Sequence, residues 1–334
     1  MTDSPELASR RIAVIGAGIA GLSCAVHLQA AGLHPQVFDK SRGLGGRLST
    51  RRGDTWQCDH GAQYFTARHP AFRVVVEAWV AAGMAAVWQP RLAVLGDASS
   101  HRPDPTLARY VGTPRMTAPA HALSQGLTLR TQSTISELRR TAQGWQLRSA
   151  ETGWLDELFD AVVLALPAPQ AGTLLAGHSA ALSSVVGSVR MRACWAVMLR
   201  FDESVNLSFD AAFVNSGPLR WIARDNSKPA RGGTETWLLH ATTDWSDAHV
   251  EADPDTVTAA LEQEFVRLGG TTATARAAHR WRYAEADAAL AIGHAWEPVI
   301  QVGVCGDWLQ GGKVEGAWLS GLALAQAITR PDTP

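Results

Sequence analysis

The feature that most constrains the fold is a glycine turn between an apolar run and a helix-forming segment. Residues 16–21 read Gly-Ala-Gly-Ile-Ala-Gly, after the β-branched run 11–15 and before the Ala- and Leu-rich segment 22–31. A second apolar run, 35–38, ends at Asp39. Strand, turn, helix and strand within about 30 residues predict parallel strands joined by a right-handed crossover, the start of a doubly wound sheet.

This turn has the residue types that a bound dinucleotide requires. Gly16 allows the sharp turn, Gly18 lets a pyrophosphate approach the backbone, and Gly21 lets helix and strand pack closely. The first helical turn also presents unpaired N–H groups and a positive dipole end to phosphate. Asp39, at the end of the second strand, is placed to accept hydrogen bonds from ribose hydroxyls.

Two glycine-containing segments follow this acid. Loop 41–47 reads Ser-Arg-Gly-Leu-Gly-Gly-Arg, in which adjacent glycines allow positive φ and Arg47 can pair with a phosphate through two hydrogen bonds. Segment 59–65, Asp-His-Gly-Ala-Gln-Tyr-Phe, offers another close backbone approach. The cofactor-binding positions predicted in this half are Gly16, Gly18, Ile19, Ala20, Gly21, Asp39, Lys40, Gly46, Arg47, Gly61, Ala62 and Gln63.

The carboxyl-terminal segment carries complementary residues. An apolar run from residue 300 leads into a Gly-Asp pair, and a Glu-Gly-Ala sequence opens an amphipathic helix predicted over 314–328. A carboxylate after a strand can accept hydrogen bonds from a polyol chain, and a helix N-terminus can stabilise negative charge on a bound ring. The residues predicted to complete the binding crevice are Gly306, Asp307, Glu315, Gly316 and Ala317.

The overall composition excludes several classes of partner. The chain has 30 basic and 31 acidic residues, so it lacks the excess of positive charge that would favour nucleic acid or an acidic membrane surface. We predict neither partner. The four cysteines lack the spacing of a zinc site or a disulfide framework, so we expect no metal and a cytoplasmic location.

Local patterns predict further elements. Residues 71–88 are rich in Val and Ala and predict a helix, whereas 89–119 are rich in proline and predict a loop. Five of the 13 tryptophans lie between 171 and 290, which suggests a second region with its own sheet and an aromatic cavity. Antiparallel strands are expected at 127–130, 135–140 and 144–148, and a buried strand at 159–166.

Together these motifs resemble a known family. The glycine turn, the Gly-Gly-Arg loop, the late Gly-Asp and the Glu-Gly-Ala sequence are similar to those of the flavin amine oxidase superfamily, which has a two-domain FAD fold. Segments 221–229, 237–246 and 279–284 further resemble the renalase subfamily. The resemblance implies noncovalent FAD, with the pyrophosphate at the glycine turn, the ribityl chain at Asp307 and the flavin ring at 315–317.

The resemblance also sets the expected fold class. We expect an α/β chain with a Rossmann-type FAD-binding domain, built on a doubly wound parallel sheet with a β-meander. An α+β substrate domain with a mixed or antiparallel sheet completes it. The FAD-binding domain is predicted to comprise residues 1–65, 111–170 and 291–334, and the substrate domain 66–110 and 171–290.

The activity implied by renalase is oxidation of misreduced dihydronicotinamide isomers, with the hydride on ring carbon 2 or 6, to NAD(P)+, while O2 is reduced to H2O2. Because the ring nitrogen pushes the hydride out and aromatisation drives the step, such a site depends chiefly on positioning. The expected positioning residues are Tyr64, His240, Trp281 and Tyr283, with Trp221 and Trp237 as further stacking candidates and Arg224 and Arg282 as phosphate contacts.

Other functions stay open. The same FAD scaffold could serve an oxidase of a small amine, a carotenoid or a porphyrinogen. Amine oxidases of this superfamily often place a lysine near the flavin, and in the predicted substrate region only Lys228 is available, in a loop-like Asn-Ser-Lys-Pro setting. A flavin-binding protein without turnover is the remaining alternative, and reduction of its cofactor by a substrate would exclude it.

Overall fold

A six-stranded sheet forms the core of one half of the molecule, in a computed structural model that describes residues 10–97, 104 and 106–330. The strand order is β18-β19-β12-β1-β2-β8, and all neighbours are parallel except β18, which runs antiparallel to β19. The predicted doubly wound sheet is confirmed. Its strands are β1 Arg11–Ile15, β2 His34–Phe38, β8 Thr128–Arg130, β12 Ala161–Leu164, β18 Ala295–Glu297 and β19 Val302–Val304.

Both faces of this sheet are covered, as the apolar runs of the central strands β1, β12 and β19 require. Ile12 and Val14 of β1 pack with helices α1 (Ile19–Ala30) and α8 (Lys313–Thr329), whereas the alternating residues Ala13 and Ile15 face the other way. That second face packs against a three-stranded meander, β9 Ile135–Thr141, β10 Gly144–Ser149 and β11 Gly153–Phe159, and against helices α4 Ala168–Leu175 and α5 Ala180–Gly187.

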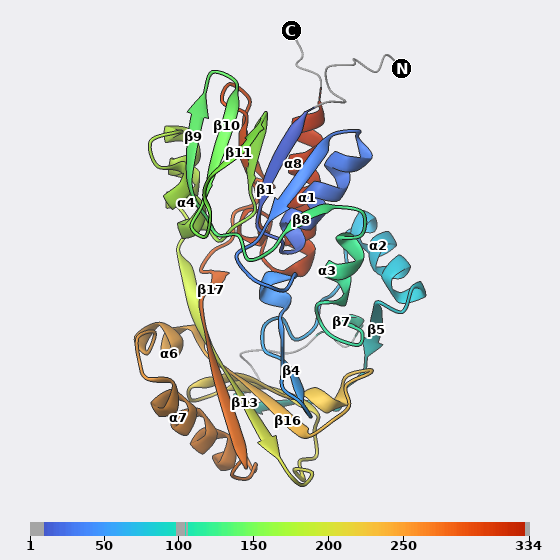
Figure 1. Cartoon of the computed structure of the whole chain (residues 1–334). Coiled ribbons are helices and arrows are strands. Elements are labelled where there is room, and N and C mark those ends of the chain that lie inside the picture. Colours follow the sequence, from blue (N-terminus) through green and yellow to red (C-terminus); the bar gives the residue numbers. More distant parts are fainter. Residues whose placement is uncertain (1–9, 98–103, 105, 331–334) are drawn as a thin grey trace.

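A second six-stranded sheet forms the other half (Figure 1). Its order is β17-β13-β16-β15-β14-β6, with antiparallel pairs except between β14 and β6. Helix α7 packs its buried residues against one face, and the other face turns towards the first half. The elements are β6 Leu92–Gly96, β13 Met191–Phe201, β14 Ala211–Asn215, β15 Leu219–Arg224, β16 Glu235–Ala241, β17 Ala275–Ala286, α6 Thr243–Ala248 and α7 Pro254–Arg267.

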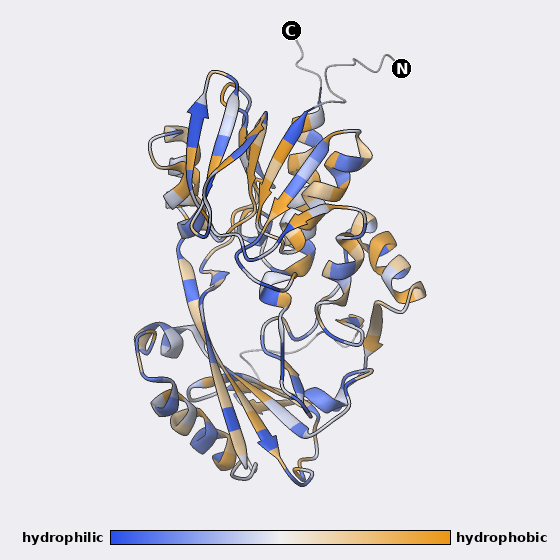
Figure 2. Cartoon of the chain, viewed as in Figure 1, coloured by the Kyte–Doolittle hydropathy of each residue, from blue (hydrophilic) through white to orange (hydrophobic). Residues whose placement is uncertain are grey.

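Hydrophobic residues run along the strands of both sheets, whereas hydrophilic residues are frequent on the outer surface of α7 (Figure 2). In the part of the chain that the structure describes, no helix is both long and apolar enough to cross a bilayer. The remaining elements are β3 Thr50–Arg52, β4 Gln57–Asp59, α2 Pro70–Ala81, β5 Ala85–Trp88, β7 Arg109–Gly112, α3 Ala118–Leu123, and the short helices η2 Gly46–Leu48, η3 Asp225–Ser227 and η4 Asp307–Leu309.

Three local predictions were wrong. The helix expected over 71–88 ends at Ala81, because Gly83 takes a left-handed φ of 72° and the chain then enters β5, which pairs with β7. The predicted loop 89–119 contains β6, β7 and the start of α3. The strand at 127–130 is parallel to β2 and belongs to the first sheet, whereas 135–140 and 144–148 do pair antiparallel.

The predicted domain boundary at residue 171 falls inside α4. Helices α4 and α5 share a hydrophobic core with the meander and the parallel sheet, so the chain enters the second sheet only at β13. Strands β13 and β17 pair from Met191 opposite Ala286 to Arg200 opposite Ala275, and they run from one half into the other (Figure 1). Residues 1–9 and 331–334 of the predicted FAD-binding domain lie outside the described residues.

Candidate functional site

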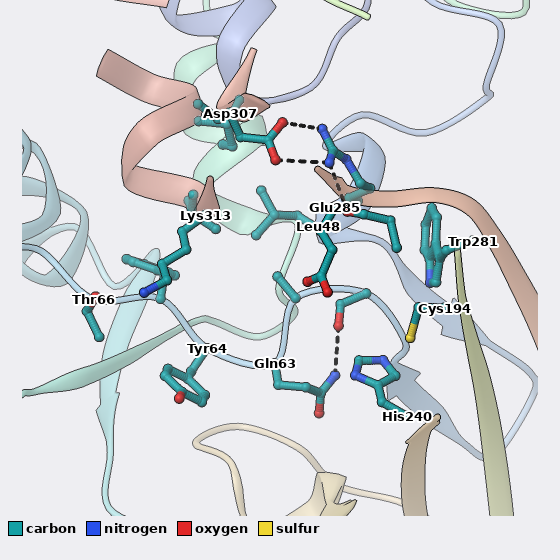
Figure 3. A pocket seen from close by; sticks show the side chains of 18 of the residues that line it. Leu48, Gln63, Tyr64, Thr66, Cys194, His240, Trp281, Glu285, Asp307 and Lys313 are labelled. Carbon is teal, nitrogen blue, oxygen red and sulfur yellow. Dashed lines mark hydrogen bonds and ion pairs between the residues drawn. The ribbon is translucent and has the colours of Figure 1, made fainter. Parts of the chain in front are cut away.

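A cavity of about 800 Å³ lies between the two halves, and Figure 3 shows many of its side chains. On one side it is lined by the glycine turn, η2 and the glycine before it, segment 61–66, η4 and the start of α8. On the other side it is lined by the inner face of the second sheet. Segments from both ends of the sequence therefore form one site.

The glycine turn gives this cavity a helix N-terminus. Gly16 has a φ of 111°, and a Cβ on Gly21 would overlap the carbonyl oxygen of Gly16, so both positions require glycine. Gly18 is different, because no atom lies within 4 Å of the place its Cβ would take. It precedes α1 without a side-chain cap and lines the cavity, so a phosphate can reach the first N–H groups of the helix.

Arg47 and Asp307 meet across the cavity wall. The two guanidinium nitrogens Nη2 and Nη1 donate to Oδ1 and Oδ2 at 2.6 and 3.0 Å, as the dashed lines at Asp307 in Figure 3 indicate. Arg47 Nη1 also donates to the carbonyl oxygen of Ala284 on β17, at 2.9 Å. Two predicted cofactor contacts, one from each end of the sequence, are thus brought together and tied to the second sheet.

The inner face of the second sheet supplies a row of side chains. Strand register sets Trp281 opposite Cys194, and Trp221 opposite both His240 and Phe213. All five line the cavity. The pairing of β15 with β16 is irregular between Leu219 and Trp221, and both Arg220 and Trp221 line the cavity although they are consecutive.

His240 contributes a neutral imidazole ring to this face, with one nitrogen that donates and one that can accept. Its Nε2 lies 3.1 Å from the carbonyl oxygen of His60, which also accepts from Trp281 Nε1 at 2.8 Å. Since a carbonyl can only accept, Nε2 of His240 carries the hydrogen and Nδ1 keeps a lone pair. Burial, reinforced by the nearby charge of Arg220, lowers the pKa of His240 to about 3, so the ring is uncharged at neutral pH.

Positive side chains outnumber negative ones in the cavity lining. The cations are Arg47, Arg68, Arg109, Arg220 and Lys313, and the acids are Asp104, Glu285 and Asp307. Asp307 pairs with Arg47, and Glu285 pairs with Arg220 at 2.6 Å. The other three cations, Arg68, Arg109 and Lys313, share the described lining with one further carboxylate, Asp104.

Two of these cations have notable surroundings. The guanidinium of Arg109 lies 5.5 Å from the centre of the Tyr64 ring, and its Nε is buried with no hydrogen-bond partner among the described residues. Lys313 begins α8 with a φ of 66°, which is unusual for a residue other than glycine and is found more often at functional sites. Figure 3 shows its ammonium group reaching towards Thr66 and Tyr64.

Two family models match consecutive segments of the chain. Residues 14–79 match the NAD(P)-binding Rossmann-like domain, and residues 79–329, most of the chain, match the flavin containing amine oxidoreductases. The chain belongs to the flavin-containing amine oxidoreductase family. It is therefore an FAD-dependent oxidoreductase, as the glycine turn and the late Gly-Asp predicted.

Individual relatives of the chain are distant. The 15-cis-phytoene desaturase of Synechococcus elongatus is 40% identical over 62 residues, which cover 19% of this chain and only 12% of the desaturase. A candidate protoporphyrinogen oxidase from Exiguobacterium superposes with a TM-score of 0.78 at 14% identity, over 96% of this chain and 98% of the other. Cyclohexylamine oxidase from Brevibacterium oxydans gives 0.71 at 12% identity, with the same coverage. These structures share the fold.

The cavity of this oxidoreductase fits FAD. The open space at Gly18, beside the N-terminus of α1, is what a pyrophosphate requires, and the Arg47–Asp307 pair offers both donors and acceptors further along the wall. The predicted cofactor residues that line the cavity are Gly18, Ile19, Ala20, Arg47, Gly61, Ala62, Gln63, Gly306, Asp307 and Ala317.

Other predicted residues of the oxidoreductase lie behind the lining. Gly16, Gly21 and Gly316 allow close backbone packing, Gly46 takes a positive φ of 52°, and Lys40 is exposed. Asp39 accepts hydrogen bonds from the backbone N–H groups of Ala17 and Ser41, both at 2.7 Å. Glu315, expected at the flavin ring, instead accepts from the N–H groups of Arg68 and His69, because its side chain leaves α8 towards the start of α2.

The predicted substrate residues likewise divide into those that line the cavity and those that do not. Tyr64, Trp221, His240 and Trp281 line the cavity, but Tyr283 does not. Trp237 points to the opposite face of β16 from His240 and is buried with Phe209 and Phe265, as alternation along a strand dictates. Arg224 pairs with Glu235, Arg282 pairs with Glu251, and neither lines the cavity. Sequence reasoning missed Arg68, Arg109, Cys194, Arg220, Glu285 and Lys313.

Proposed function

We propose that the protein is a renalase-like oxidase that removes a hydride from misreduced dihydronicotinamide dinucleotides, with the hydride on ring carbon 2 or 6, and releases NAD(P)+. Bound FAD would supply the hydride acceptor and transfer the two electrons to O2, giving H2O2. The substrate ring loses one hydride and becomes aromatic, so no side chain has to remove a proton from it. The protein's own contribution is to bind and orient the dinucleotide.

The observation that carries this proposal is the positive charge of the cavity lining. After the Arg47–Asp307 and Arg220–Glu285 pairs are set aside, Arg68, Arg109 and Lys313 remain with a single described carboxylate, Asp104. A pyrophosphate is attracted to such a group of cations, whereas a protonated amine is repelled by it. The lining therefore favours an anionic dinucleotide over a small amine.

The inner sheet face supplies contacts suited to a nicotinamide ring. The neutral His240 can accept a hydrogen bond from a carboxamide N–H2 group through Nδ1. Trp281 and Trp221 lie on either side of it along the row, and Tyr64 packs against Trp221 with ring centres 5.7 Å apart. Aromatic faces of this kind hold a flat ring while the acceptor fixes its rotation.

The position of Lys228 also argues against amine oxidation. This lysine, the candidate for a group near the flavin, does not line the cavity. Its ammonium group is fully buried and bonded to Asp59, Gln63 and Asp225. Lys228 therefore cannot be the lysine that amine oxidases commonly place near the flavin.

Anaerobic mixing of the purified holoenzyme with two kinds of reductant tests the proposal. Borohydride reduction of NAD+ gives a mixture of dihydronicotinamide isomers, and a panel of monoamines provides the second arm. We expect bleaching of the flavin absorbance with the isomer mixture, followed by H2O2 formation when air is admitted. Bleaching by amines alone would overturn the proposal, and bleaching by neither would favour a binding protein without turnover.

A further inference from the structure

A cluster of four buried charges lies behind the cavity wall. Asp59 on β4, Asp225 in η3, Lys228 and Arg231 have side chains that are at most 1% exposed. Lys228 Nζ lies 2.9 Å from Asp225 Oδ1 and 3.2 Å from Asp59 Oδ2, and Arg231 Nη2 lies 2.7 Å from Asp59 Oδ2. The cluster therefore joins β4, which follows β1 and β2 of the first half in the sequence, to residues 225–231, which follow β15 of the second sheet.

The charges of Asp59 and Lys228 are maintained by their neighbours, whereas burial outweighs the nearby cations at Asp225 and raises the pKa of its carboxyl. Burial opposes ionisation of Asp59, but Lys228 and Arg231 outweigh it and hold the pKa of this carboxyl below its ordinary value. Burial likewise opposes the charge of Lys228, and Asp225 and Asp59 more than compensate, so the pKa of the ammonium group is raised. Buried ion pairs seldom add net stability compared with apolar residues of similar size, so folding stability alone does not explain this cluster.

One route from the cluster to the cavity runs through Gln63. All three hydrogens of the Lys228 ammonium group are used, on Asp59, Asp225 and the side-chain oxygen of Gln63 at 3.2 Å. The Gln63 amide nitrogen in turn donates to the carbonyl oxygens of Asp59 at 2.5 Å and Gly61 at 3.2 Å. Lys228 thus fixes the side chain that closes segment 59–63, and Gly61 and Gln63 line the cavity.

A second route runs through Trp88. The Lys228 ammonium group lies 5.7 Å from the centre of the Trp88 ring, and Trp88 Nε1 donates to the hydroxyl of Ser227 at 3.2 Å. Trp88 packs against Tyr64 and Trp221, with ring centres 6.3 and 6.4 Å apart. Both aromatic rings line the cavity, so the same ammonium group supports two adjoining parts of its wall.

We propose that Lys228 is a positioning residue for the hydride transfer, which acts through Gln63 on segment 59–63 and through Trp88 on the aromatic wall. The inference rests on the proposed function only in the identity of the hydride donor. Displacement of a positioned reactant by about 1 Å can slow a reaction roughly 100-fold, so support behind the wall matters although Lys228 does not touch the cavity.

The test uses K228M, Q63M and the double variant in the FAD-loaded protein. Both substitutions keep an unbranched side chain and remove the polar groups that link the cluster to segment 59–63. We expect each single variant to retain FAD but to show an altered visible circular dichroism of the bound flavin. The rate constant for anaerobic flavin reduction at saturating substrate should fall about 10- to 100-fold. If Lys228 acts through Gln63, the double variant should be little slower than K228M.

R276M is the matched control, because Arg276 pairs with Glu262 on α7 and does not line the cavity. It should leave the flavin spectrum and reduction rate unchanged. Reduction of K228M at the wild-type rate with an unaltered flavin spectrum would overturn the inference, whatever its effect on Tm, and so would fully additive losses in the double variant. If K228M does not fold, Q63M alone decides by the same two measurements.

The two proposals fail separately. If wild-type protein is not reduced by the dihydronicotinamide isomers, the proposed substrate is wrong, and the flavin circular dichroism still reports whether Lys228 orders the cavity wall. If wild type is reduced but K228M, Q63M and R276M all behave like it, the substrate stands and the positioning role of Lys228 is wrong.

Discussion

Two glycines of the same turn should respond in opposite ways to alanine. In G18A the new methyl group enters the cavity, since no atom lies within 4 Å of it, and the backbone angles of Gly18 (φ −77°, ψ 177°) suit alanine. Loss of a glycine at the N-cap costs about 0.5–1 kcal/mol of helix stability. The methyl group should occupy space that the pyrophosphate needs, so we expect FAD to bind about 100-fold more weakly, which is about 2.8 kcal/mol.

In G21A the clash is internal. The new Cβ would lie well inside 3.0 Å of the Gly16 carbonyl oxygen and 2.9 Å from the Ala165 Cβ, so α1 and the glycine turn must separate. Because the overlap is with a backbone oxygen, which cannot rotate away, we expect a cost near the upper end of about 1–3 kcal/mol for overpacking, offset by up to about 1 kcal/mol of helix propensity. The apoprotein of G21A should therefore be less stable than that of G18A.

Urea unfolding of the apoproteins and titration with FAD, followed by quenching of flavin fluorescence, measure the two effects separately. Stability must be compared without cofactor, since FAD binding itself stabilises the folded state. FAD affinity in G18A within about threefold of wild type, a difference of less than 1 kcal/mol, would refute the assignment of this turn to the pyrophosphate.

Three further predictions concern the rest of the site. K313M should weaken binding of NAD+ about tenfold, or about 1.4 kcal/mol, in a spectral titration of the bound flavin, whereas R276M should not; equal affinities would exclude Lys313 as a phosphate contact. Because the pKa of His240 is about 3 when folded and near 6.5 when unfolded, the unfolded chain binds more protons between these values and stability rises with pH there. H240Q should reduce that slope by up to about 1.4 kcal/mol per pH unit in urea titrations between pH 4 and 6, and an unchanged slope would contradict the burial argument. Acid or heat precipitation should release the flavin into the supernatant, and retention in the pellet would show covalent attachment.

The parallel sheet and the glycine turn were predictable because their signals are local. Glycine is required at Gly16 and Gly21 by close backbone approach, and the apolar run at 161–164 reflects burial on both faces. Such features leave a trace within a few residues of sequence. The same holds for Gly306 and Asp307, which follow directly from an apolar strand.

The substrate side of the cavity was less predictable, because its residues are selected by register and by long-range pairing. Trp237 and His240 lie three residues apart on one strand, yet only His240 faces the cavity. Arg220 enters the site where the pairing of β15 with β16 becomes irregular, and Arg109 follows a proline-rich stretch that gave no strand signal. No spacing in the sequence marks either arginine.

The paired strands β13 and β17 also bear on how substrate reaches the site. Met191 and Ala286, at one end of this ribbon, belong to the core of the first half, and Leu199 and Ala278, towards the other end, belong to the core of the second. The ladder between the two strands is irregular between Arg192 and Cys194, on the stretch that joins the two cores, so the ribbon bends more easily there than an unbroken ladder would. Cys194, Trp281 and Glu285 adjoin this irregular step and line the cavity, so a bend of the ribbon there changes the shape of the space that substrate enters and product leaves.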